Sequence, residues 1–173
     1  KIWEFTGHTG IVRSVAVDID GNVYSGSEDK KVMKISSSGQ KIWEFTGHTG
    51  IVRSVAVDKD GNVYSGSADK KVMKISSSGE KLWEFTGHTG EVTSVAVDNN
   101  GNVYSASADK KVMKISSSSE KIWEFTGHID WVLSVSVDKD GNVYSGSVDK
   151  KVMKNELKRE LLGYKVLTVE RGL

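Results

Sequence analysis

The chain has 173 residues, enough for one domain, with 24 basic and 23 acidic side chains and a formal net charge of +1. This balance argues against a nucleic-acid or membrane-surface role, since both require a concentrated basic field. The absence of cysteine excludes disulfides, thiol chemistry and cysteine-type zinc sites. The sequence contains no run of about 18 apolar residues, so no membrane-spanning helix is predicted.

A segment of forty residues recurs along the chain, with copies that begin at Lys1, Lys41, Lys81 and Lys121. The second copy differs from the first at three positions, and the later copies differ somewhat more. A fixed period of this length indicates one supersecondary unit copied along the chain. The fourth copy ends at Lys154, and residues 155–173 are predicted to form a separate tail.

Four short strands are predicted in each copy. In the first copy they cover residues 1–5, 12–17, 23–27 and 31–36, where side chains alternate as in a sheet. The segment Asp18–Asn22 between the second and third contains an Asp-Gly pair, which favours a tight hairpin turn. A calcium loop is disfavoured there, because it would need more ligands and a distant bidentate glutamate.

A single four-stranded sheet would leave an apolar face in water, so neighbouring copies must cover one another. Radial stacking of four-stranded sheets gives a β-propeller. We therefore predict an all-β fold, a β-propeller of four-stranded antiparallel blades with four blades per chain, over residues 1–154.

Closure of the ring follows from the order of the strands. The fourth copy lacks an outer strand, whereas residues 2–6 form a spare one that we expect to complete the last blade, in cis or in trans. Four blades must turn 90° at each interface and eight only 45°, and small inner residues such as Ser14 and Ala16 suit the smaller angle. Two chains in an eight-bladed ring are favoured over a closed four-bladed monomer or a fragment of a longer array.

The tail departs from the repeat. Residues 155–163 are predicted to form a short helix, with Asn155 as its N-cap and Gly163 at its end. Residues 164–170 alternate like a strand, which could compete for the outer slot of the last blade or pair with another chain. A flexible tail and the start of a further domain remain alternatives.

The segments Gly7-His8 and Ser25-Gly26-Ser27-Glu28-Asp29 resemble the motifs of WD-repeat propellers, and they recur four times. The resemblance implies a buried hydrogen-bonded network of His, Ser and Asp in each blade. The Trp-Asp pair of that family is replaced here by Ile35-Ser36, so a shorter network is expected. Its members would be His8, Ser25 and Asp29, then His48, Ser65 and Asp69, then His88, Ser105 and Asp109, then His128, Ser145 and Asp149.

The segment from Gly39 to Phe45 is similar to the Gly-Lys-x-x-Trp segment of quinoprotein-type propellers, whose tryptophan docks between blades. By this resemblance, four tryptophans are expected to be packing groups. They are Trp3, Trp43, Trp83 and Trp123.

Ser25, His8 and Asp29 are also the parts of a hydrolase triad. The set occurs in four copies, and an enzyme seldom needs four equivalent nucleophiles. No nucleophile elbow or oxyanion motif accompanies it. The structural interpretation is therefore preferred, and no catalytic residue is predicted.

Three sets of positions differ between copies and are predicted to lie at one end of the ring, the end that WD-repeat proteins commonly use for binding partners. Trp131 is the sharpest case, because Trp and Arg are enriched in binding hot spots. Drift after a recent duplication is the alternative, and positions 19, 59, 99 and 139 at the opposite end also vary. The predicted partner-binding residues are Ile11, Ile51, Glu91 and Trp131, then Arg13, Arg53, Thr93 and Leu133, then Glu28, Ala68, Ala108 and Val148.

These observations favour a non-catalytic propeller scaffold that binds a protein or peptide, with a homodimer as its assembly. A structural, self-assembling repeat protein is the alternative. An enzyme of quinoprotein type would need a cofactor cavity ringed by Arg, Asp and Glu with metal ligands, which the sequence does not offer. No cofactor, metal, nucleic acid or membrane partner is predicted.

Overall fold

The computed structural model describes residues 2–155, and every regular element in this range is a β-strand. The predicted all-β class is therefore confirmed. The predicted helix and strand of the tail lie outside the described residues. Within residues 2–155, no helix is long and apolar enough to cross a membrane.

The first sheet shows why the repeat folds as it does. Its strands are β1 (Val12–Val17), β2 (Val23–Ser27), β3 (Val32–Ile35) and β4 (Lys41–Phe45), paired antiparallel in chain order. Valine, isoleucine and aromatic residues alternate with small or polar ones, and successive side chains of a strand point to opposite faces of the sheet. A β-bulge between Val12 and Ser14 places Val12 and Val15 on one face.

The remaining strands repeat this plan. The second sheet holds β5 (Val52–Val57), β6 (Val63–Ser67), β7 (Val72–Ile75) and β8 (Lys81–Phe85). The third holds β9 (Val92–Val97), β10 (Val103–Ser107), β11 (Val112–Ile115) and β12 (Lys121–Phe125). The fourth has three strands, β13 (Val132–Val137), β14 (Val143–Ser147) and β15 (Val152–Asn155). We call these sheets blades 1 to 4.

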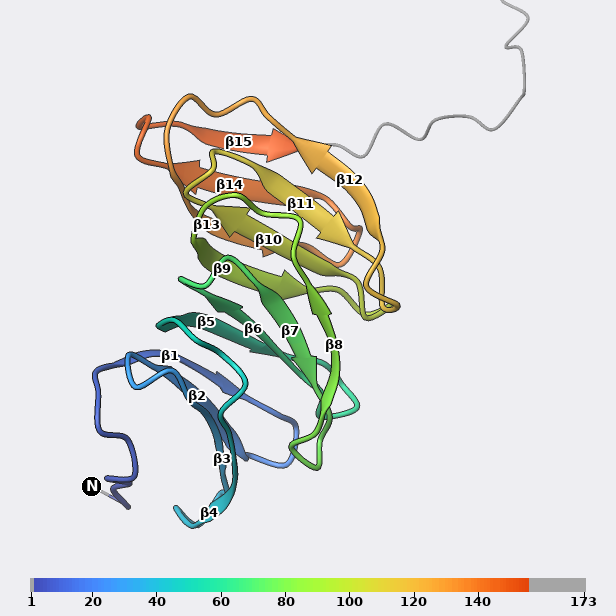
Figure 1. Cartoon of the computed structure of the whole chain (residues 1–173). Helices are drawn as coiled ribbons and strands as arrows, with labels where there is room; N and C mark the ends of the chain where they lie inside the picture. The colour runs from blue at the N-terminus through green and yellow to red at the C-terminus, as the bar shows by residue number, and fades with distance from the viewer. Residues whose placement is uncertain (1, 156–173) are drawn as a thin grey trace, which may run out of the picture.

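The blades follow one another as a fan (Figure 1). Successive first strands, β1, β5, β9 and β13, contact one another, and β4, β8 and β12 lie at the far edges of their sheets. Blade 1 and blade 4 lie at opposite ends of this row, so residues 2–155 form an open arc rather than a closed ring.

The predicted hairpin turn is present between the first two strands of each blade. In blade 2, the amide of Asp58 donates to the carbonyl of Asn62 over 3.0 Å, and Gly61 has a φ of 77°. The Asp58 carboxylate also accepts hydrogen bonds from the amides of Asp60 and Asn62. The glycine is needed because this φ is costly for a residue with a Cβ.

The core lies between blades. Tyr24 and Val32 of blade 1 are buried against Val55, Met73 and other apolar residues of blade 2. The same arrangement recurs between blades 2 and 3 and between blades 3 and 4. A polar contact accompanies it, because the Ser14 hydroxyl accepts a hydrogen bond from the Val55 amide over 3.1 Å.

Tryptophans from the outer strands complete these interfaces. Trp43 packs against the core between blades 1 and 2, and its Nε1 donates to the carbonyl of Ser77 in blade 2 over 3.0 Å. Trp83 makes the same bond to Ser117 of blade 3. Gly79 lies under Trp43, where a Cβ would approach the indole ring to 3.0 Å. The tryptophans that join blades are packing groups, as the quinoprotein resemblance implies.

One sequence prediction differs from the structure. Residues 2–8 form no strand, although residues 42–45 of the next copy do. A strand needs a neighbour for its backbone hydrogen bonds, and the strand expected to pair with residues 2–6 is β15, at the other end of the arc. Asn155 ends β15, and its side chain donates to Ser145. The helix that it is predicted to cap lies outside the described residues.

Core packing between blades predicts a large penalty for truncating an interface residue. Met73 is 1% exposed in the core between blades 1 and 2. We expect Met73→Ala to lower the free energy of unfolding by about 2–4 kcal/mol, because it removes buried surface and leaves a cavity. Urea denaturation measures this. Leu82→Ala, at an exposed position of β8, should change stability by less than about 0.5 kcal/mol, and equal losses would contradict the assignment of the core.

Candidate functional site

A network of His, Ser and Asp is found in every blade. In blade 2, His48 Nδ1 lies 2.8 Å from the carboxylate of Asp69, and its Nε2 lies 2.7 Å from the hydroxyl of Ser65. The other three networks have the same connections. They join His8 to Ser25 and Asp29, His88 to Ser105 and Asp109, and His128 to Ser145 and Asp149.

The network fastens two loops to each other. Asp69 also accepts hydrogen bonds from the amides of Thr49 and Lys71, both at 3.0 Å. The loop before β5 is thereby tied to the turn between β6 and β7. The buried His48 ring lies perpendicular to the ring of Phe45 in blade 1, with 6.4 Å between ring centroids, so the network also contacts the neighbouring blade.

The order of these bonds is that of a hydrolytic triad, but the setting differs. Ser65 and Ser105 are fully buried, and His48 is almost so. A substrate carbonyl would have to reach a serine oxygen that already contacts the imidazole inside the protein. Burial with every polar group paired is the usual state of a structural network.

The network also perturbs the acidity of its carboxylates. Burial of Asp69 opposes ionisation, but the hydrogen bonds from His48, Thr49 and Lys71 outweigh it and lower the pKa from 3.8 to about 2. The same causes lower the pKa of Asp109 to about 2 in blade 3. The ionised carboxylate is therefore the form that the fold stabilises.

The lowered pKa values predict an acid-sensitive fold. Because folding lowers the pKa of Asp69, its stabilising contribution is complete above about pH 4 and is lost as the pH falls towards 2. We expect the urea midpoint of the parent protein to fall across this range. Asp69→Asn should lower the midpoint at pH 6 and flatten the dependence below pH 4. Asp109→Asn should repeat the result, and a full slope in both variants would contradict the assignment.

The three variable sets lie together at one end of the fan, which we call the variable end. It comprises Ile11, Arg13 and Glu28 of blade 1 and their counterparts in the other blades. In blade 1, the Glu28 amide donates to the carbonyl of Ile11 over 2.9 Å. The same bond joins Ala68 to Ile51, Ala108 to Glu91 and Val148 to Trp131.

Contacts within the variable end link neighbouring blades. Arg13 forms an ion pair with Glu28 in its own blade, whereas Arg53 pairs across the interface with Glu91 of blade 3. Thr93 of blade 3 donates to the carbonyl of Val132 in blade 4. Sequence reasoning placed these positions at one end but missed the pairing, since it depends on distances between blades.

Blade 4 differs from the others because its variable positions are all apolar. Trp131 is 47% exposed, and Leu133, Val148 and the adjacent Ile129 are exposed as well. We call these four residues the blade 4 patch. The Trp131 amide donates to the Asp130 side chain over 2.8 Å, which constrains the loop that carries the indole.

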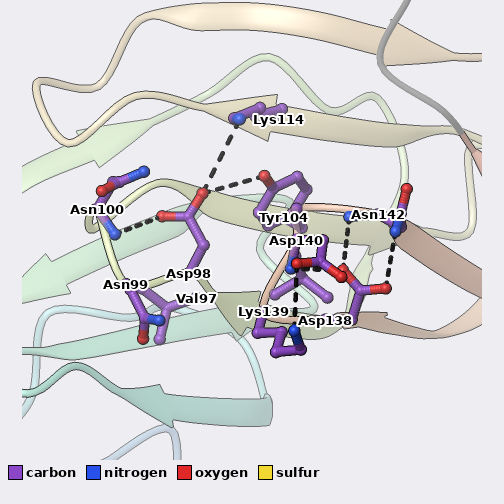
Figure 2. A pocket seen from close by; sticks show the side chains of 12 residues that line it. Val97, Asp98, Asn99, Asn100, Tyr104, Lys114, Asp138, Lys139, Asp140 and Asn142 are labelled. Carbon is purple, nitrogen blue, oxygen red and sulfur yellow. Dashed lines mark hydrogen bonds and ion pairs between the residues drawn. The ribbon is translucent and has the colours of Figure 1, made fainter.

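The opposite end of the fan holds an open pocket of about 650 Å³ between blades 3 and 4 (Figure 2). Asp98 accepts a hydrogen bond from Tyr104 at 3.1 Å and lies 3.9 Å from the Lys114 ammonium. Across the pocket, hydrogen bonds from Asn142 hold the pKa of Asp138 at about 2. From the sequence these segments are predicted only as turns. The sequence signal for this pocket is the Asp and Tyr, six residues apart, that recur in each copy.

This pocket does not fit the cofactor that a quinoprotein resemblance would imply. Its lining is Asp, Asn, Lys, Val, Tyr and Gly, without arginine or glutamate. Within residues 2–155, no group of three or more His, Asp or Glu residues is placed to hold a metal ion. No step of chemistry is therefore assigned to such a group.

Four repeated antiparallel sheets joined by docked tryptophans define a propeller-type repeat protein. Residues 1–124 and 28–153 match the model of a family described as outer membrane protein assembly factor BamB. The chain belongs to this family, whose repeats are of the quinoprotein type, as the second resemblance indicates. The WD-repeat resemblance rests on the sequence motifs alone. No curated protein matches the chain.

Proposed function

We propose that this chain is a non-catalytic scaffold that binds a protein or peptide through the variable end. The observation that carries the proposal is the blade 4 patch. Four apolar side chains are exposed there, at positions where earlier copies hold Ile, Arg, Glu, Thr or Ala, so only blade 4 is apolar at all four. Exposed apolar groups that cluster on a soluble surface are a feature of interaction sites.

The setting of the patch suits a peptide or protein better than a small molecule. The patch is bordered by blade 3, whose Glu91 forms an ion pair with Arg53 of blade 2 and whose Thr93 donates a hydrogen bond to blade 4. An apolar centre with polar and charged groups at its margin is typical of protein interfaces. The matching family is described as an assembly factor for outer membrane proteins, a description that also supports a protein ligand.

Trp131 provides the test of this proposal. Peptides selected from a displayed library on the immobilised protein should bind Trp131→Ala at least tenfold more weakly, because a hot-spot tryptophan contributes about 2 kcal/mol or more. Isothermal titration with the selected peptides measures the change. Lys139→Ala, at the opposite end, is the control and should leave affinity unchanged. Equal affinity for the parent and Trp131→Ala would contradict binding at the patch.

We further propose that the scaffold is a homodimer whose two chains form an eight-bladed ring. The open arc of a single chain supports this, because each end blade has a neighbour on one side only among residues 2–155 (Figure 1). A self-assembling repeat protein without a dedicated ligand is the alternative, and the paired state is common to both. The variable end then distinguishes them, since only the scaffold selects peptides there.

Pairing of two chains predicts the mass in solution. Multi-angle light scattering should give about twice the 18.9 kDa of one chain, at concentrations where the interface is saturated. A mass of one chain at all accessible concentrations would contradict the homodimer and favour a closed four-bladed monomer. A mass that rises without limit would instead indicate an open fibre.

A further inference from the structure

The two end blades expose surfaces that are buried everywhere else in the fan. On the outward side of blade 1, which we call the first face, Val15 is 63% exposed, whereas its counterpart Val55 is 6% exposed. Val12 and Val17 are also exposed on this face. Within residues 2–155, no sheet packs against this side of blade 1.

The outward side of blade 4, which we call the last face, is exposed in the same way. Val152 is 82% exposed, whereas Val72 at the same position of blade 2 is fully buried. Tyr144 is also partly exposed, although Tyr64 is buried. The first face and the last face are thus the two halves of an interface that the chain makes three times internally.

The N-terminal segment already contacts blade 1 as the outer strand of a preceding blade would. Trp3 Nε1 donates to the carbonyl of Ser37 over 3.1 Å, as Trp43 does to Ser77. His8 then joins the network of blade 1, as His48 joins that of blade 2. This segment therefore occupies the position of β4 relative to β5–β8, although residues 2–8 belong to no sheet in the described part of the chain.

Within the described residues, blade 4 has three strands where the other blades have four. We propose that residues 2–5 of one copy add to the outer edge of β15 in a second copy, which completes blade 4 and joins the first face to the last face. The proposal rests on the pairing of two chains proposed above and specifies how it is made. β3 and β4 give the register, in which Val32, Met33 and Lys34 lie opposite Phe45, Glu44 and Trp43. Val152, Met153 and Lys154 would then face Phe5, Glu4 and Trp3 of the second copy.

The internal interfaces also predict the polar contacts of the joint. Ser14, Ser54 and Ser94 each accept a hydrogen bond from the amide of a valine in the next blade. Ser134 occupies the same position in blade 4 and would accept one from the Val15 amide of the second copy. The joint thus continues an interface that the protein already contains.

A second copy suits the first face better than the same chain does. The first and last faces lie at opposite ends of the arc, separated by blades 2 and 3 (Figure 1). Residues 2–5 cannot therefore reach β15 of their own chain without bending every interface between them. A second arc of equal curvature presents its last face to the first without such bending.

Cysteine cross-linking tests the register, since the natural chain has no cysteine. We expect Glu4→Cys combined with Met153→Cys to give a covalent dimer on oxidation or with a short bis-maleimide, as seen on non-reducing gels. Met73→Cys with Glu84→Cys, a pair that lies opposite within blade 2, is the control and should cross-link only within one chain.

The outcomes separate the joint from the pairing itself. A cross-link within a single chain would overturn exchange between copies and show closure in cis. A twofold mass without any cross-link between residues 4 and 153 would overturn the strand addition but leave the homodimer intact. A single-chain mass would overturn both the homodimer and the strand addition.

A variant on the last face provides a second readout. A Cβ at Gly66 would lie 2.6 Å from Val92 of the next blade, whereas Gly146, its counterpart in blade 4, meets only the Ser134 hydroxyl at 2.9 Å. We expect Gly146→Arg to remain folded but to have a single-chain mass at concentrations tenfold above those that pair the parent. Asp140→Ala, which changes net charge equally at an exposed turn, should remain paired. A paired Gly146→Arg would contradict the proposed joint.

Discussion

Burial of one sheet against the next is the interaction on which the rest of the structure depends. Each blade is one sheet thick, so it has no interior of its own, and its apolar side chains are covered only by a neighbour. Tyr24, Val32 and the facing valines of blade 2 form one such contact. The stability of the fold therefore resides in the interfaces. The number of interfaces determines how much apolar surface of each blade is shielded from water.

The other recurring features serve these interfaces. The network around His48 fixes the loop that leads into β5, and that strand supplies Val52 and Val55 to the contact with blade 1. Trp43 extends the same contact outward to Ser77. Because these groups hold the blades together, the residues that are left to vary are those at the ends of the strands. The variable end consists of such residues.

Much of the fold was predictable because its signals are local. Alternation in VRSVAV and VYSGS gives the strands β1 and β2, and Asp-Gly pairs give the hairpins between them. The grouping of Ile11, Arg13 and Glu28 followed from their places at strand ends. Non-local pairing was not predictable in this way. The Arg53–Glu91 ion pair depends on the spacing of two blades, and residues 2–6 show that a strand-like sequence without a neighbour remains unpaired. Lys70, with a φ of 71°, occupies a left-handed turn position that sequence rules reserve for Gly or Asn.

The near-identity of successive copies has a consequence for how the chain reaches its native state. Every first strand has several competing neighbours of nearly the same sequence, so local contacts alone do not distinguish a correct order of blades from a shuffled one. Connections of fixed length within the chain impose the order, but chains that refold together at high concentration lack that constraint between them. Repeat proteins of this kind are prone to misassembly and domain swapping. Positions at which the copies differ therefore favour one order of blades over the others. Glu91 and Thr93 are examples, because their contacts with Arg53 of blade 2 and Val132 of blade 4 need particular neighbours.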